Sequence, residues 1–144
     1  METMRRRTAI AVLWASAAVT MSAHMILMML DPVALQKAGQ WATAAGAADW
    51  VSTTVFWLVP LWMAFVTVAA GPVASRRANI AAGVLLTLLN VYHFLVCAFP
   101  VLPGGPYAAA TIQHLLLVGS PIVSTVLVTW LAWTWEEGQT NQGR

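Results

Sequence analysis

The sequence predicts an all-α membrane protein, folded as a single four-helix transmembrane bundle over residues 1–144 with both termini in the cytoplasm. Hydrophobic residues make up 60% of the 144 positions and charged residues only 8%, whereas roughly a quarter of the residues in soluble domains are charged. The apolar residues also gather into four runs. Each run is long enough, at ~1.5 Å per helical residue, to cross a hydrocarbon core of ~30 Å.

The four predicted spans follow one another with short connections. They cover about residues 8–30, 50–70, 79–99 and 108–135. The first span contains one ionisable residue, His24, and Asp49 can cap the start of the second. Ser75 can cap the third span in the same way, and Gly105 with Pro106 can open the fourth after a turn at residues 101–104.

A short interfacial helix is predicted between the first two spans, over about residues 32–38. Asp31 followed by Pro32 is typical of a helix N-terminus. Gly39 is typical of a helix end. We therefore expect one or two helical turns at the membrane surface before the second span.

The first apolar run has an alternative interpretation as a cleaved signal peptide. A basic leader at residues 5–7 precedes it, and the small residues at 15–17 and 21–23 resemble cleavage sites. The apolar run continues to Leu30, beyond both of these sites, which favours a retained span.

Arginines mark one side of the predicted bundle. They lie at residues 5–7, before the first span, and at 76–77, between the second and third. Because cytoplasmic loops carry an excess of Lys and Arg, both termini and this loop are expected in the cytoplasm. Arginines at the ends of apolar runs do not form a face that could follow phosphates, so nucleic acid is not an expected partner.

Polar residues recur on one face of each predicted span and should form an inward polar axis. The members that we expect on this axis are Thr20, Asp49, Asn79, Asn90 and Gln113. Lipid cannot satisfy a hydrogen-bond donor or acceptor, so such side chains turn inward and bond across helices. The simplest interpretation is that they hold the helices together.

Three histidines fall at nearly the same predicted depth. His24, His93 and His114 each lie seven residues from a predicted outer boundary, about 10 Å into the membrane. Ionisable residues within a membrane are costly and usually face the bundle interior. The simplest interpretation, with no cofactor, is that each imidazole bonds a polar neighbour on its own or an adjacent helix.

A metal or haem site is the alternative interpretation of this histidine layer. The three imidazoles suit copper or zinc, and Met21, Met28 and Cys97 would add soft ligands for copper(I). Two of the histidines could instead bind haem b as axial ligands. These possibilities stay open at the level of the sequence.

Three sequence elements resemble an uncharacterised bacterial family of small four-span integral membrane proteins. They are the segment at 59–63, an Arg-Ala-Asn-Ile-x-x-Gly element at 77–83 and an Ala-Trp-x-Trp element at 132–135. The resemblance implies a four-helix fold in the bacterial cytoplasmic membrane and supplies no activity, substrate or cofactor.

The leading functional interpretation is a small non-enzymatic membrane component of unknown biochemical role, with the lipid bilayer as its environment. The alternatives are a metal- or haem-binding redox protein that uses the histidine layer, and a small-solute or proton pathway formed by an oligomer. A homo-oligomer or a membrane partner is compatible with each. No nucleophile with a base and an orienting partner is recognisable, which disfavours an enzyme.

Overall fold

The computed structural model describes residues 2–98 and 108–135 of the chain. Within the helices, the side chains at 2–3, 28, 33–34, 37–38, 41, 52, 96–98 and 108–114 are not described. Five helices make up these ranges: α1 (Glu2–Leu30), α2 (Pro32–Ala44), α3 (Ala47–Ala69), α4 (Pro72–Ala98) and α5 (Ala108–Trp133). All except α2 are long and apolar enough to cross a membrane, which confirms the predicted all-α fold with four spans.

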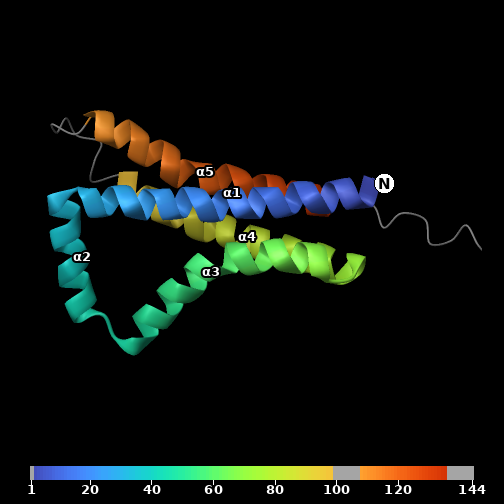
Figure 1. Cartoon of the computed structure of the whole chain (residues 1–144), viewed down its shortest axis with the longest axis horizontal. Coiled ribbons are helices and arrows are strands. Elements are labelled where there is room, and N and C mark those ends of the chain that lie inside the picture. The colour runs from blue at the N-terminus through green and yellow to red at the C-terminus, as the bar shows by residue number, and fades with distance from the viewer. Residues whose placement is uncertain (1, 99–107, 136–144) are drawn as a thin grey trace, which may run out of the picture.

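The long helices pack along a common axis (Figure 1). α1 contacts α3 and α5, and α4 contacts α5 and α3. The start of α1 and the end of α5 lie at the same end of the bundle, where Arg6 Nη1 donates to the Thr134 carbonyl oxygen at 2.7 Å. Both ends of the described chain are therefore on one side, as an even number of crossings requires.

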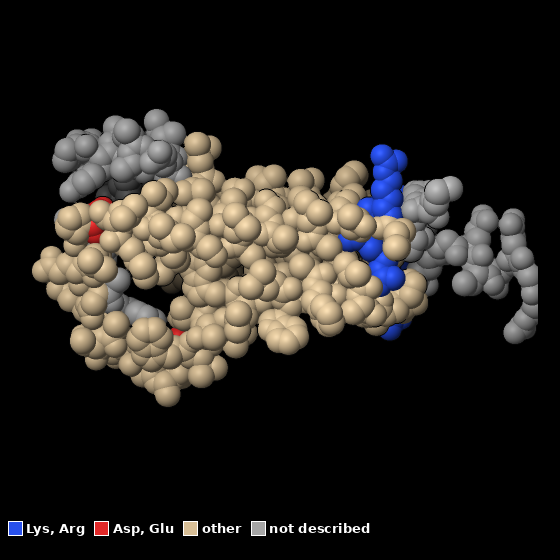
Figure 2. Space-filling view, in the orientation of Figure 1, with Lys and Arg blue, Asp and Glu red and all other residues tan. Residues whose placement is uncertain are grey.

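The opposite end of the bundle is more open. There α2 turns away from α1, and the first part of α3 leads back toward the other helices (Figure 1). Figure 2 shows the surface hollowed between α1, α2 and α3 at this end. α3 changes direction part of the way along its length, and Pro60 inside it removes one backbone donor and disfavours a straight helix.

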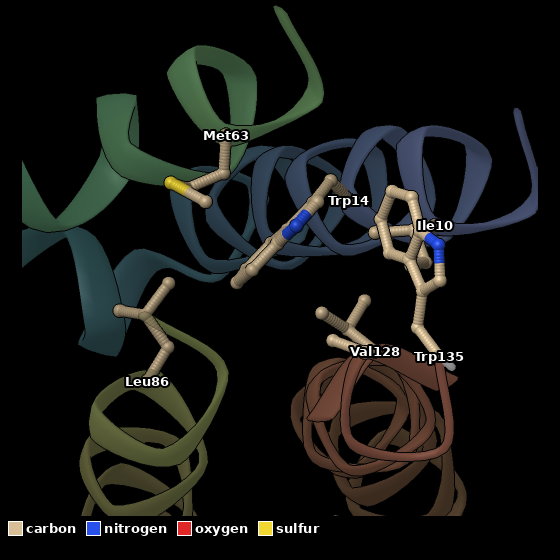
Figure 3. Close-up of a cluster of buried hydrophobic side chains, with 7 residues drawn as sticks. Ile10, Trp14, Met63, Leu86, Val128 and Trp135 are labelled. Atoms are coloured by element: carbon tan, nitrogen blue, oxygen red, sulfur yellow. The ribbon is translucent and has the colours of Figure 1, made fainter. Parts of the chain in front are cut away.

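A buried apolar cluster holds the arginine-rich half of the bundle together (Figure 3). It combines residues of α1, α3, α4 and α5 with Trp135, just beyond α5: Ile10, Trp14, Met63, Leu86, Val128, Ala132 and Trp135. Ile10, Trp14 and Val128 are fully buried. The first apolar run thus contributes large side chains to the core.

The outward faces of the long helices are also apolar. Val19, Phe65 and Leu116 are 67%, 64% and 68% exposed, although they belong to three different predicted spans. Contiguous apolar surface of this extent is unfavourable in water and is what lipid tails cover in a membrane protein. The exposed faces agree with a multi-pass integral membrane protein.

The helix between the first two spans is longer than predicted. It runs through Gly39 and ends at Ala44, so the predicted end at residue 38 is wrong. A glycine inside a helix costs only about 1 kcal/mol relative to alanine, and the alanine-rich sequence that follows favours a continued helix. The helix ends instead shortly before Gly46, the N-cap of α3.

Two predicted helix starts also differ in detail. Ser75 does not cap the third span, because α4 begins at Pro72 and Ser75 lies within its first turns. Proline suits a first helical position, where no amide donor is needed. Asp49 does cap the second span, but from inside the helix, where its Oδ2 accepts a hydrogen bond from the Gly46 amide at 2.9 Å.

Candidate functional site

A buried polar network joins three helices in the arginine-rich half. Asn79 on α4 is fully buried, and its Oδ1 accepts hydrogen bonds from Trp14 Nε1 on α1 at 2.6 Å and from Thr67 Oγ1 on α3 at 3.0 Å. Its Nδ2 donates to the Ser75 carbonyl oxygen at 2.7 Å. Ser75 Oγ in turn donates to the Thr67 carbonyl oxygen at 3.2 Å. The network uses both the oxygen and the nitrogen of the Asn79 amide, and its hydrogen bonds hold α1, α3 and α4 together.

A second polar contact brings α4 and α5 close together. Thr87 Oγ1 donates to Thr125 Oγ1 at 2.9 Å. One turn away, a Cβ added at Gly83 would overlap the Thr129 hydroxyl and would lie 3.4 Å from the Thr125 carbonyl oxygen. Only glycine permits this approach, as is common where membrane helices cross.

Arginines close the helix ends on this side of the bundle (Figure 2). Arg7 on α1 donates through Nε to the Thr67 carbonyl oxygen and through Nη2 to that of Val68, both at 2.8 Å, at the end of α3. Arg76 on α4 donates through Nε to the Ala132 carbonyl oxygen of α5 at 3.2 Å. The last carbonyls of a helix lack intrahelical donors and carry partial negative charge, so a guanidinium satisfies both needs.

The charged side chains that the structure describes are separated along the bundle axis. Arginines gather at the end where α1 begins, whereas Asp31 and Asp49 lie at the opposite end (Figure 2). Most of the membrane-embedded length between them contains no charged side chain among those described. The arginines at residues 5–7 and 76–77 therefore lie at one end of the bundle.

Imidazoles can bind a metal ion or a proton. The histidine layer is therefore the best candidate for a functional site in this bundle. His24 on α1 is 4% exposed, and His93 on α4 is partly buried. The centres of their imidazole rings are 5.7 Å apart, and the ring planes meet at 81°. Two of the three predicted members thus come together from helices that are distant in the sequence.

A small cavity adjoins this histidine pair. It has a volume of about 10 Å³, which is near the lower limit for one water molecule. Its wall combines residues of α1, α3, α4 and α5: Met21, His24, Phe56, Trp57, Asn90, His93, Leu117, Val118 and Pro121. Asn90 donates its Nδ2 to the Leu86 carbonyl oxygen of its own helix at 2.8 Å. All four long helices therefore contribute side chains to the wall of a cavity about the size of one water molecule.

Other predicted site residues occupy different positions. Met21 lines the cavity and is 5% exposed. Thr20 is partly buried and donates to the Ser16 carbonyl oxygen of its own helix at 2.9 Å, and Asp49 is exposed at the start of α3. Asn79 and Asn90 are both buried, as an inward polar axis requires.

Several members of the predicted histidine and polar layers lie outside the described side chains. They are Met28, Cys97, Gln113 and His114. Among the residues that the structure does describe, no group of three His, Cys, Asp or Glu is placed to hold a metal ion. A three-histidine site consequently stays a prediction.

Two residues that belong to the polar network or to the cavity wall were not recognised in the sequence. Trp14 lies in an apolar run near the arginines and looks like an interfacial tryptophan, yet it is fully buried and donates to Asn79. Phe56 belongs to the cavity wall but has the pattern of any lipid-facing aromatic residue. Only the positions of neighbouring helices distinguish these roles.

Comparison of the chain with protein-family models, with curated proteins and with solved structures finds no match. The resemblance of residues 77–83 and 132–135 to a bacterial four-span family accordingly stays a prediction.

Proposed function

We propose that this protein is a small non-enzymatic membrane component that binds one transition-metal ion at His24 and His93. The observation that carries the proposal is the approach of these two imidazoles to 5.7 Å beside a small cavity. Ionisable side chains are rare within membranes and usually have a function there. A pair of them on converging helices is therefore a candidate functional site.

The ring separation suits shared ligation. A ligating imidazole nitrogen lies about 2.0 Å from zinc, so the centres of two rings on one ion are about 5 to 6.5 Å apart. The observed separation of 5.7 Å lies within this range. A perpendicular pair is also a common packing arrangement for aromatic rings, so the metal assignment depends on the other groups around the cavity.

Met21 and Asn90 supply those groups. Met21 lies one turn before His24 on α1, and Asn90 lies one turn before His93 on α4; both line the cavity. A thioether beside two imidazoles favours a soft ion such as copper(I) over magnesium or calcium, which prefer oxygen ligands. The Asn90 amide adds one oxygen for hydrogen bonding to a ligand or to a water.

The size of the cavity supports an ion rather than an organic ligand. Sites for small organic molecules have volumes of about 300–1,000 Å³, and this cavity has about 10 Å³. A haem held by His24 and His93 would need its macrocycle between two rings that here contact each other edge to face. The geometry of this pair does not fit haem b, and it likewise gives no room for a reacting organic substrate.

Metal titration of the purified protein in detergent tests the proposal. We expect one copper(I) or zinc ion per chain, measured by competition with a chromophoric chelator and by elemental analysis. Replacing His24 by phenylalanine keeps a ring in the core and removes the ligand nitrogens, so the affinity should fall more than about 100-fold, given that even outer-sphere partners commonly contribute 10- to 100-fold. Sub-stoichiometric metal, or equal binding by H24F, would refute the proposal.

The methionines of α1 offer a matched control. Met21 lines the cavity, whereas Met25, one turn further along, is 37% exposed and is not part of its wall. Met21→Leu should weaken copper(I) binding while leaving zinc binding nearly unchanged, because a thioether is a soft ligand. Met25→Leu should leave both unchanged, and His114→Ala shows whether the third histidine adds a ligand.

A further inference from the structure

A second depression lies between α4 and α5, away from the histidine pair. It has a volume of about 360 Å³ and is lined from α4 by Val84 and Leu88 and from α5 by Val126, Trp130 and Trp133. These five side chains are between 47% and 69% exposed. The groove is thus open on the outside of the bundle, where a membrane component can enter it.

The lining of the groove is almost entirely apolar. Thr87 and Thr129 are its polar members. The single Thr87 hydroxyl hydrogen is shared between the Gly83 carbonyl oxygen at 2.7 Å and Thr125 Oγ1 at 2.9 Å. The Thr129 hydroxyl donates to the Thr125 carbonyl oxygen at 2.8 Å. With both hydroxyl hydrogens engaged inside the bundle, the groove suits an apolar chain.

One end of the groove is cationic. Arg77 lies seven residues before Val84 on α4, which places it on the same helix face about 10 Å away. Arg76 Nη2 donates to the carbonyl oxygen of Trp133, at the rim of the groove, at 3.4 Å. Arg77 is exposed, so its guanidinium is available at the level where the groove ends.

We propose that this groove binds an anionic phospholipid, with an acyl chain along α4 and α5 and the phosphate headgroup at Arg77 and Arg76. An apolar channel that ends in guanidinium groups matches a molecule with an apolar tail and an anionic head. Basic pockets between membrane helices recognise anionic headgroups in this way, and tryptophans at the rim sit at headgroup depth.

Charge also argues against a second copy of the chain in the groove. Two copies in the same membrane orientation, related by a two-fold axis along this face, would bring their Arg77 side chains together. Like charges that are brought close together repel each other and oppose association. A lipid phosphate instead neutralises the arginines.

Native mass spectrometry of the full chain in detergent, with phosphatidylglycerol and phosphatidylcholine of identical acyl chains, tests the proposal. The wild-type protein should retain phosphatidylglycerol in preference. Arg77→Gln should reduce that preference about five-fold, the contribution of one basic residue near a membrane surface. Arg5→Gln removes the same charge from an exposed position near the start of α1, at the same end of the bundle, and should leave the preference within about two-fold.

A second pair of variants tests the groove itself. Val126→Trp fills it and should lower the retention of both lipids, whereas Val123→Trp, at a 60% exposed position of α5 outside the groove, should not. Circular dichroism and elution volume verify that each variant is folded. Equal retention of the two lipids, an Arg5→Gln effect equal to that of Arg77→Gln, or a dimer that only Val126→Trp dissociates would each overturn the proposal.

Discussion

Replacing Asn79 by alanine removes the centre of the polar network that joins α1, α3 and α4. The amide oxygen accepts two interhelical hydrogen bonds, from Trp14 at 2.6 Å and from Thr67 at 3.0 Å. Interhelical bonds in membrane proteins contribute about 0.6 kcal/mol each on average, and up to about 1.7 kcal/mol. The two bonds together should therefore contribute about 1.2 kcal/mol.

The indole donor adds to this cost. The Thr67 hydroxyl hydrogen, which is shared between Asn79 Oδ1 and the Met63 carbonyl oxygen at 2.6 Å, keeps the second acceptor. Trp14 is fully buried and would lose its acceptor. A buried donor without a partner costs about 1–3 kcal/mol. The expected loss in the free energy of unfolding is about 2–4 kcal/mol, measured by circular dichroism during unfolding in mixed micelles.

Asn90 provides the matched control on the same helix. It is also buried, at 4% exposure, but its amide donates only to Leu86 of its own helix. Asn90→Ala should cost less than about 1 kcal/mol, since no interhelical bond is lost. A double-mutant cycle between Trp14→Phe and Asn79→Ala should give a coupling of about 0.6–1.7 kcal/mol. Equal losses for the two asparagines, or a coupling below about 0.3 kcal/mol, would show that the network does not stabilise the bundle.

Three further predictions concern other parts of the fold. Gly83→Ala should lower the free energy of unfolding by about 1–3 kcal/mol, because the new Cβ overlaps the Thr129 hydroxyl. Gly39→Ala, where a new Cβ has nothing within 4 Å, should be neutral or stabilise by up to about 1 kcal/mol. An equal loss at both glycines would contradict the close crossing of α4 and α5. Arg7→Gln should lower the free energy of unfolding by about 1–2 kcal/mol through the lost hydrogen bonds to the end of α3. Arg5→Gln should change it by less than about 0.5 kcal/mol in the same assay, and a larger loss for Arg5→Gln than for Arg7→Gln would contradict the capping role. Reporter tags fused to the two termini should both report the cytoplasm, and tags on opposite sides would contradict four crossings.

Much of the fold followed from the residues themselves. The four runs that become α1, α3, α4 and α5 are evident because hydropathy and length are properties of single segments. Helix ends followed less directly from the sequence: Gly39 has the pattern of a stop, but alanine-rich neighbours let α2 continue to Ala44. Ser75 has the pattern of a cap and instead donates to Thr67 across the turn between α3 and α4.

The candidate site was predictable in its members but not in its pairing. Equal depth marked His24 and His93 as one layer, and depth is fixed by residue count along each helix. Whether two imidazoles touch depends on how each helix is rotated and how the helices cross, which sequence periodicity leaves open. The contribution of Phe56 to the cavity wall depends on the same angles.

The sequence by itself determined that lipid is the expected surrounding of this protein, how many helices can cross it and which end of the bundle carries the arginines. The length of an apolar run and the position of a charge are properties of single segments. Only the tertiary structure decided that His24 meets His93 and that Trp14 bonds Asn79. Each of these pairs is separated by more than 60 residues and joins α1 to α4. Their contacts depend on the packing of both helices against α3 and α5, which no single segment encodes.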